Sequence, residues 1–334
     1  MRALVTGGGG FLGQYIVQQL LAEGHRVRVL GRGTYPQLAE QGVEIYQADL
    51  RDGEAVAKAC AGQDVVFHTA AKAGVWGKWR EYHGINTLGT YHVIAGCRRA
   101  GVPRLVYTSS PSVTFAGTDQ CGIDESAPYP DRWLAHYPHS KALAEQAVLA
   151  AADTSLATCA LRPHLIWGPR DSHLIPRLLD RARRGRLRIV GRGDNLIDMV
   201  YVENAASAHL LAAEALAKPN SDASGKAYFI SQGQAVNCWD WIGEILVLAG
   251  LEKPRKAVSA ATAYRVGAAL EGVWRALHLP GEPPMTRFVA AQLSTSHYFD
   301  ISAGRRDLNY TPTITTEQGM QRLAEWIHET DAIT

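Results

Sequence analysis

Tyr137 and Lys141 are the first residues of this sequence that could do chemistry together, because they stand four apart in the run Tyr-Pro-His-Ser-Lys. Residues at this spacing project from the same face of a helix. A phenol loses its proton near pH 10, so proton exchange with a carbonyl or alcohol at neutral pH requires a lower pKa. An ammonium about 4 Å away would favour the phenolate by roughly 4 kcal/mol, which predicts that Lys141 lowers the pKa of Tyr137.

Hydroxyl groups that could assist this pair lie in the segment 108–112. The segment follows a short apolar run at 105–107 and contains Ser109, Ser110 and Ser112. A serine hydroxyl opposite the phenol would orient a substrate oxygen and stabilise the charge that develops on it during hydride transfer. All three serines remain candidates on this argument.

A glycine-rich turn follows the first predicted strand and opens the first predicted helix. Gly7, Gly10 and Gly13 lie in the run Thr-Gly-Gly-Gly-Gly-Phe-Leu-Gly, with Phe11 and Leu12 inside it. The first glycine permits a tight turn, the second lets a pyrophosphate approach the helix N-terminus, and the third lets helix and strand pack closely. The pattern predicts a dinucleotide-binding turn; a glycine-rich surface loop is the alternative.

The end of the second predicted strand indicates which dinucleotide is bound. Enzymes that prefer an unphosphorylated adenosine ribose usually have Asp or Glu here, about 20 residues after the glycines, to accept its 2′-hydroxyl. This sequence has Gly31 and Arg32 instead. Glycine leaves room for a 2′-phosphate and the guanidinium can pair with it, which predicts NADPH as the cofactor. In the alternative, Arg32 lies on the adenine or in solvent.

Two further segments are candidates for the walls of this site. Asp49 and Leu50 follow the third predicted strand, where a carboxylate can accept a hydrogen bond from an adenine amino group. Asp52 is the better candidate for the helix cap in this segment. Thr69 and Ala70 follow the fourth predicted strand, and small residues there suit the ribose and phosphates, although core packing would favour small residues too.

The elements that position these residues alternate regularly over the first 165 residues. Short apolar runs alternate with amphipathic stretches of helical period, such as 11–22 and 137–151. The predicted strands are 3–6, 26–30, 44–47, 65–68, 105–107 and 158–162. Nearly continuous apolar strands are typical of a parallel sheet covered on both faces. The sequence therefore predicts an α/β fold, with a Rossmann-type doubly wound parallel sheet and a smaller C-terminal substrate-binding cap.

The pattern changes after Gly168, and this change sets the predicted domains. We expect residues 1–168 to form the dinucleotide-binding domain, to which 198–230 return. Residues 169–197 and 231–300 would form the cap, followed by a C-terminal helical segment at 301–334.

Composition limits the class of protein. The chain has 334 residues, 46% apolar and 20% charged, with 34 Lys and Arg against 32 Asp and Glu, which argues against disorder and against nucleic-acid binding. Five cysteines without a Cys-x-x-Cys pair predict free thiols. We recognise no export signal and no stretch that could span a membrane, so we expect a cytoplasmic protein without a transmembrane segment.

Two other signals carry little weight. The histidines lack the His-Glu-x-x-His spacing, and His136 and His139 flank Tyr137, where hydride chemistry needs no metal. We therefore expect no metal site. The arginine-rich run 181–188 lacks interleaved aromatic residues, which favours a solvated helix face.

The motifs together resemble the extended branch of the short-chain dehydrogenase/reductase superfamily. The glycine turn resembles its TGxxGxxG pattern, and Tyr137-x-x-x-Lys141 resembles its catalytic pair. The runs LRPHLIWGP at 161–169 and DMVYVENAA at 198–206 resemble the LRPxxIxGP and DxVYVxNxA signatures of the 3β-hydroxysteroid dehydrogenase family. This resemblance covers nearly the whole chain.

The resemblance implies roles for particular residues. It implies that Ser110 is the catalytic serine beside Tyr137 and Lys141, and that Pro163 lines the nicotinamide. Asn86 begins a match to an NxxGT helix motif, where organising the fold explains it at least as well as a part in the reaction. The predicted cofactor-binding residues are Gly7, Gly10, Phe11, Leu12, Gly13, Arg32, Asp49, Leu50, Thr69, Ala70, Tyr137, Lys141 and Pro163.

Within the family, the chain is most similar to bacterial reductases of long-chain olefin biosynthesis. This implies NADPH-dependent reduction of a 2-alkyl-3-oxoalkanoic acid with two fatty tails to the 2-alkyl-3-hydroxy acid, by a homodimer that could associate with other enzymes of its pathway. Such a substrate needs an apolar trough and a cation. The amphipathic stretch 258–279 and Arg265, Arg275 and Arg287 are candidates, although the stretch could equally be core, lid, membrane surface or partner surface.

Three other functions remain open. A 3β-hydroxysteroid or sterol-carboxylate dehydrogenase would oxidise its substrate with NAD. The absence of Asp or Glu at Gly31 and Arg32 argues against the use of NAD. An epimerase would need a second phosphate cradle in the cap. A non-catalytic NADPH-sensing regulator would have no use for a tuned phenol.

Overall fold

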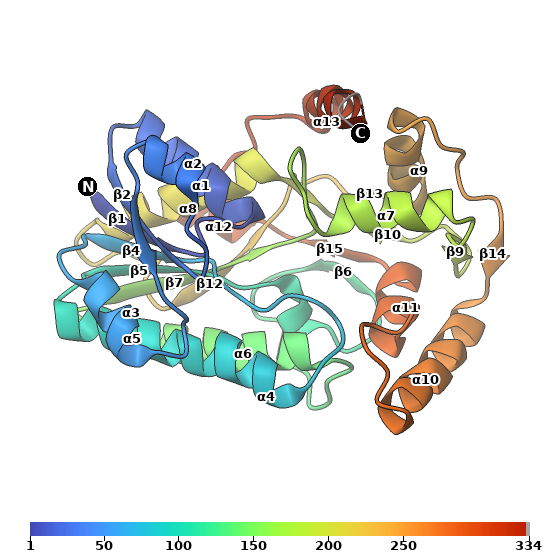
Figure 1. The fold of residues 1–334 in the computed structure, drawn as a ribbon, viewed down its shortest axis with the longest axis horizontal. Coiled ribbons are helices and arrows are strands. Elements are labelled where there is room, and N and C mark those ends of the chain that lie inside the picture. Colours follow the sequence, from blue (N-terminus) through green and yellow to red (C-terminus); the bar gives the residue numbers. More distant parts are fainter. Residues whose placement is uncertain (332–334) are drawn as a thin grey trace.

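A seven-stranded parallel sheet forms the centre of the molecule (Figure 1). The structure, a computed structural model, describes residues 1–331. The strands run in the order β12-β7-β5-β4-β1-β2-β3. They are β1 Arg2–Thr6, β2 Arg26–Gly31, β3 Glu44–Gln47, β4 Val65–His68, β5 Arg104–Thr108, β7 Ala157–Pro163 and β12 Lys226–Ile230. The predicted doubly wound parallel sheet is confirmed, and the six strands predicted from the sequence lie in it.

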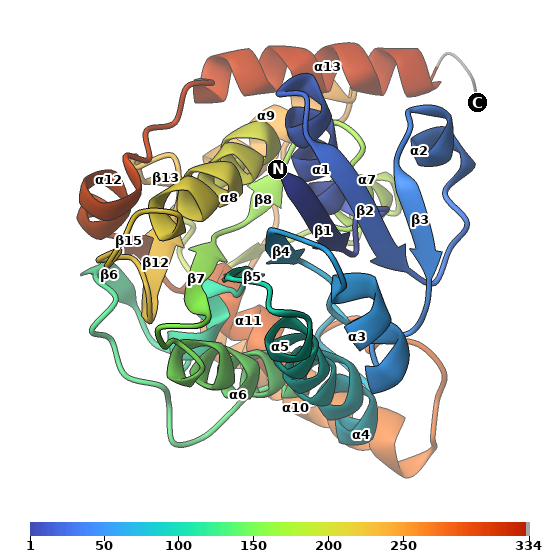
Figure 2. The same ribbon diagram turned by 90° about the vertical axis from the view of Figure 1, so that its left-hand side faces the viewer.

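Helices cover both faces of this sheet, because successive side chains along a strand point to opposite faces. In β1, Ala3 and Val5 belong to one buried apolar cluster and Leu4 to another. The Leu4 face carries α3 Gly53–Cys60, α5 Gly89–Ala100 and α6 His136–Ala150, and the opposite face carries α1 Phe11–Ala22 and α8 Val202–Leu216 (Figures 1 and 2). Short helical segments on the connections are α2 Pro36–Glu40, α4 Trp79–Tyr82, the π-helix η1 His83–Leu88 and the 3₁₀-helix η2 Pro111–Thr114.

A second region lies beside the main sheet (Figure 1). Its four-stranded sheet has the order β13-β10-β15-β6, and β11 and β14 pair with β8 and β9. These strands are β6 Gln120–Ile123, β8 Ile166–Trp167, β9 Ile189–Val190, β10 Leu196–Ile197, β11 Val200–Tyr201, β13 Val236–Asn237, β14 Ala257–Val258 and β15 His297–Phe299. The remaining helices are α7 Leu174–Arg183, α9 Cys238–Leu248, α10 Ala260–Ala276, α11 Arg287–Ser294, α12 Ser302–Leu308 and α13 Thr316–Asp331.

The chain crosses between the two regions. β12, from the predicted returning segment 198–230, pairs with β7 in the main sheet, whereas β6, within 1–168, pairs with β15 of the second region. The segment 301–334 contains α12 and α13, and its last residues, 332–334, lie outside the described residues. The division into a dinucleotide domain and a substrate cap at 169–197 and 231–300 remains a proposal.

Strand order reverses between β1 and β4, so a crevice is expected at the carboxyl ends of these two strands. The glycine turn after β1 lies at this point. A Cβ on Gly13 would lie 2.2 Å from the carbonyl oxygen of Gly7, which itself has a φ of +72°. The start of α1 therefore presses directly onto the turn, and a side chain at Gly13 has no space.

We predict that Gly13→Ala lowers the free energy of unfolding by about 1–3 kcal/mol, because the turn must move to admit the methyl group. Gly272→Ala is the matched control, since Gly272 lies in α10 with nothing within 4 Å of the added Cβ. The control should gain about 0.5–1 kcal/mol from reduced backbone entropy. Urea unfolding measures both changes, and a Gly13→Ala variant as stable as the parent would contradict the packing argument.

Candidate active site

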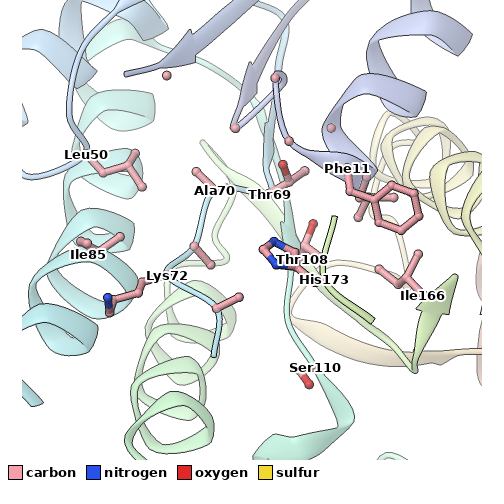
Figure 3. A pocket seen from close by; sticks show the side chains of 18 of the residues that line it. Phe11, Leu50, Thr69, Ala70, Lys72, Ile85, Thr108, Ser110, Ile166 and His173 are labelled. Atoms are coloured by element: carbon pink, nitrogen blue, oxygen red, sulfur yellow. The ribbon is translucent and has the colours of Figure 1, made fainter. Parts of the chain in front are cut away.

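A cavity of about 630 Å³ opens at the carboxyl edge of the main sheet. All the predicted cofactor-binding residues line it, from Gly7 at the glycine turn to Tyr137 and Lys141, and so does Ser110. Figure 3 shows part of this lining, with Phe11, Thr69, His173 and Ser110 among the labelled side chains. The structure thus brings the predicted residues together, and their individual roles remain predictions.

The nucleotide end of the cavity is built for an anion. α1 begins after Gly10, which has no side chain to cap it, so the N–H groups of its first turn are left for a ligand. The tight turn is held by Gly7 N–H donating to Leu30 O over 2.8 Å and by Gly10 N–H donating to Gly7 O over 2.9 Å. These residues fit the pyrophosphate of a dinucleotide.

Lys141 is buried in α6 with few partners. It is 2% exposed, and its Nζ donates to the backbone oxygen of Thr108 over 2.5 Å. The same nitrogen lies 4.1 Å from the centre of the Tyr107 ring. Burial lowers the pKa of Lys141 to about 7, and the charge of Glu145 opposes this shift. The amino group is therefore poised between its charged and neutral forms at neutral pH.

Tyr137 does not show the lowered pKa that the sequence predicts. Burial raises the pKa of its phenol, and a hydrogen bond with Ser110 opposes the rise. The prediction is wrong for a physical reason. Burial removes the hydration that stabilises the phenolate of Tyr137 and the ammonium of Lys141, so it raises the pKa of the first group and lowers the pKa of the second. The reactivity of Tyr137 therefore depends on whatever keeps Lys141 charged.

The three candidate serines differ in position. Ser109 and Ser110 line the cavity, and Ser112 is not part of the lining in the described chain. Ser110 caps η2, where its Oγ accepts from Ser112 N–H over 3.2 Å. Because Ser110 also acts on the phenol of Tyr137, the geometry favours it over Ser109 as the partner of that phenol.

Asn86 lies in the π-helical turn η1 and positions its neighbours. Its Oδ1 accepts from Lys72 N–H over 2.7 Å, and its Nδ2 donates to Lys72 O and to Ser140 Oγ over 3.1 and 2.9 Å. Ser140 in turn donates to the backbone oxygen of Tyr137 over 2.8 Å. These contacts tie the loop after β4 to the helix that carries Tyr137, which supports an organising role for Asn86.

The predicted adenosine end of the cavity contains one ion pair that the sequence does not indicate. Arg51 donates to both carboxylate oxygens of Asp49 over 2.7–2.9 Å, and this pairing lowers the pKa of Asp49 to about 2. The contact of Asp49 with adenine remains a prediction, and its carboxylate is shared with Arg51.

Tyr35 is a lining residue that sequence reasoning missed. Its φ is +44°, a left-handed conformation that is unusual for an aromatic residue. A Cβ on Gly9, Gly31 or Gly33 would lie within 3 Å of the Tyr35 side chain, which places its ring beside the exposed Arg32. The left-handed backbone conformation of Tyr35 brings its ring over these glycines. Residue spacing in the sequence does not report such a conformation, so it could not identify Tyr35 as a lining residue.

The basic side chains that line the cavity also differ from those predicted for the substrate carboxylate. Lys72 and His173 line it, whereas the proposed arginines of the cap do not within residues 1–331. Arg287 is paired with Glu271 over 2.7 Å, Arg275 lies 5.5 Å from the centre of the Trp76 ring, and Arg265 borders a different cavity. Their nearness in sequence to an apolar stretch was the only signal, and α10 and α11 direct them elsewhere.

The described residues contain neither a membrane-spanning helix nor a metal-binding cluster. Over residues 1–331, no helix combines the length and apolar character needed to cross a bilayer. Within the same residues, no three histidine, cysteine or acidic side chains are grouped so that they could hold a metal ion.

The chain is similar to known proteins over nearly its whole length. Residues 4–259 match the model of the 3-beta hydroxysteroid dehydrogenase/isomerase family. The chain is 51% identical over 326 residues to a 2-alkyl-3-oxoalkanoate reductase from Stenotrophomonas maltophilia (strain K279a), covering 97% of this chain and 98% of that protein. It is 33% identical over 332 residues to a decarboxylating sterol-4-alpha-carboxylate 3-dehydrogenase from Mus musculus, covering 98% and 91%. The solved structure of MoeE5 in complex with UDP-glucose and NAD has a TM-score of 0.74 at 26% identity, covering 99% of each chain.

The depressed pKa of Lys141 predicts how stability changes with pH. An unfolded lysine titrates near pH 10.4, so between about pH 7 and 10 the unfolded chain binds more protons here than the folded chain does. Stability should therefore rise with pH at this site. Relative to Lys141→Met, we expect the parent to gain about 2 kcal/mol between pH 7 and 9 in urea unfolding. A difference between the two proteins that stays the same at both pH values would refute the depressed pKa.

Proposed function

The chain belongs to the 3-beta hydroxysteroid dehydrogenase/isomerase family, and we propose that it reduces the ketone of a 2-alkyl-3-oxoalkanoic acid with NADPH. It is an oxidoreductase, as are its relatives, which are named reductases and dehydrogenases. The observation that carries the proposed substrate is the 51% identity to a reductase of that name, over 97% of this chain.

The residues at the reacting end support this chemistry. Bound NADPH supplies the hydride that adds to the ketone carbon. Tyr137 donates its phenolic proton to the ketone oxygen, and charged Lys141 stabilises the phenolate that results. Ser110 donates a hydrogen bond to the same oxygen and holds it near the phenol. The product is the 2-alkyl-3-hydroxy acid.

The adenosine end supports NADPH over NADH. β2 ends at Gly31 without a carboxylate that could accept the 2′-hydroxyl of NADH. The exposed guanidinium of Arg32 lines the cavity beside this glycine, and it can pair with a 2′-phosphate through two N–H groups.

The other end offers what a fatty keto acid requires. Lys72 is the proposed partner of the substrate carboxylate. In the structure its Nζ lies 3.0 Å from Oε2 of Glu81. The apolar partner is a small cluster separate from the two main ones. Its members are Phe115, Phe288 and Ala291, with Val75, Leu134, Ala135 and Val289 packed against them. Phe115 follows η2 and Ala135 precedes α6, so we propose that the alkyl tails extend from the cavity toward this cluster, none of whose members lines the cavity itself.

The biological setting is proposed from the same similarity. We place the reaction in long-chain olefin biosynthesis in the cytoplasm and expect a homodimer that could associate with other enzymes of its pathway. A sterol carboxylate is the second candidate substrate, because the sterol-4-alpha-carboxylate dehydrogenase from Mus musculus matches along nearly its whole length.

The substrate proposal is tested by assay of the purified protein in both directions. We expect NADPH oxidation with a 2-alkyl-3-oxo acid and NADP⁺ reduction with the 2-alkyl-3-hydroxy acid, and little with sterols or nucleotide sugars. The reverse assay is needed because 3-oxo acids lose carbon dioxide readily.

Tyr137→Phe should lower kcat by about 10²–10⁴ and leave NADPH binding by fluorescence titration unchanged. Turnover of a sterol alone would reject the substrate, and full activity of Tyr137→Phe would reject the role of the phenol.

The cofactor proposal is tested by Arg32→Ala. Loss of a charge-assisted contact of about 1.5–3 kcal/mol should reduce kcat/KM for NADPH by roughly 10- to 100-fold. The value for NADH should change little, because NADH lacks the 2′-phosphate. Arg192→Ala is the control, since Arg192 is 88% exposed and pairs with Asp194. An equal loss with both cofactors would argue that Arg32 does not recognise the phosphate.

A further inference from the structure

A fully buried ion pair lies one helical turn beyond Lys141. Glu145 is 0% and Arg162 3% exposed. Arg162 donates through Nη2 to Glu145 Oε1 over 2.6 Å and through Nε to both carboxylate oxygens over 3.1–3.2 Å. The phenol of Tyr129 donates to the same Oε1 over 2.7 Å. The carboxylate is therefore fixed by three neighbouring donors.

Stability alone does not explain this pair. Removing two charges from water costs about as much free energy as their attraction returns, so buried pairs add little to folding. One donor of the pair, Arg162 Nη1, is also buried without a hydrogen-bond partner. An arrangement of this kind points to a use beyond folding.

The pair has a definite orientation relative to the reacting residues. Tyr137, Lys141 and Glu145 occupy successive turns on one face of α6. Arg162 belongs to β7, and its guanidinium carbon lies 5.1 Å from the centre of the Phe229 ring on β12. The negative end of the pair thus lies on the helix that carries Lys141, and the positive end is carried by a strand of the main sheet.

No other group that faces Lys141 in the described chain supplies a negative charge. From β4, His68 is neutral, because burial and then the charge of Lys141 lower its pKa to about 3. From β5, burial raises the pKa of the Tyr107 phenol, and on α6 burial raises that of Tyr137. Glu145 is the carboxylate that opposes the loss of the proton from Lys141.

The far end of the pair has its own neighbours. Burial raises the pKa of Tyr129, so its phenol stays protonated as the donor to Glu145. Glu125 is a second carboxylate near Arg162, and its Oε1 accepts from Phe229 N–H over 2.7 Å. Tyr129 thus fixes the carboxylate of the pair, and Glu125 is held by the backbone of β12.

We propose that Glu145 and Arg162 form an oriented charge pair that opposes the deprotonation of Lys141, so that its ammonium can stabilise the phenolate of Tyr137. Both are positioning residues that act through Lys141 without touching substrate or cofactor. The proposal rests on the proposed function for the step that Tyr137 and Lys141 perform.

Opposite changes of charge at the two ends provide the test. Glu145→Gln leaves the positive charge of Arg162 unopposed, which should move the basic limb of the kcat/KM profile to lower pH by on the order of one unit. Arg162→Met leaves Glu145 unopposed and should move the same limb to higher pH by a similar amount. The direction is the same whether the limb reports Lys141 or Tyr137, because both groups respond alike to an added charge.

A merely structural role would not produce shifts of opposite sign. Glu271→Gln is the matched control, because it removes one partner of another Glu–Arg pair. Glu271 is 4% exposed, belongs to α10 and does not line the cavity, so the profile of this variant should match that of the parent. If Glu145→Gln does not fold, the double variant Glu145→Gln/Arg162→Met replaces it, with a smaller shift to lower pH. Shifts of one sign in both single variants, or an unshifted limb in folded Glu145 variants, would overturn the proposal.

A second readout separates this proposal from the proposed function. In protein labelled with ¹³C at the lysine ε-carbons, the titration of Lys141 can be followed by NMR without any substrate, and Lys141→Met identifies its signal. The same opposite shifts are expected. If the titration shifts while no 3-oxo acid is turned over, the charge pair stands and the substrate proposal fails; if turnover is found without the shifts, the charge pair fails alone.

Discussion

The burial of one ammonium group is the constraint on which the rest of the site depends. Lys141 belongs to α6, and its Nζ donates a hydrogen bond to the backbone oxygen of Thr108 at the end of β5. The side chain is buried, so little water reaches it. Exclusion of water strengthens the attraction between an ammonium and a phenolate, and it also removes the hydration that keeps the ammonium charged. The site therefore needs an additional negative charge near the lysine. The buried carboxylate of Glu145 supplies it, and its own cost is offset by Arg162 and Tyr129.

The fold could be predicted in detail because its signals are local. Apolar runs of four to seven residues, such as β4 and β7, can be recognised in the sequence, and glycines at 7, 10 and 13 mark the turn between β1 and α1. Short paired strands such as β6 and β15 escaped prediction. Their pairing joins residues 120–123 to 297–299, and contacts this far apart in sequence leave no periodic pattern.

The same distinction applies to the site. Motifs with fixed spacing identified lining residues such as Tyr137 and Lys141, because a helix converts spacing into proximity. Tyr35 and Lys72 lie on connections whose paths are set by unpredictable local geometry, a left-handed φ in one case and the grip of Asn86 in the other. The direction of the Tyr137 pKa was predicted wrongly, because a pKa depends on burial and a spacing does not report burial. Fold likeness to MoeE5 also leaves the substrate open, since one fold supports many reactions.

The central claim is that a charged Lys141 stabilises the phenolate of Tyr137 during catalysis. It is tested most directly by following the phenol itself, with ¹³C at the tyrosine ζ-carbons, in the complex with saturating NADP⁺. The account predicts that the phenol of Tyr137 titrates at least about one pH unit lower in the parent protein than in Lys141→Met. Identical titration in the two proteins would contradict it.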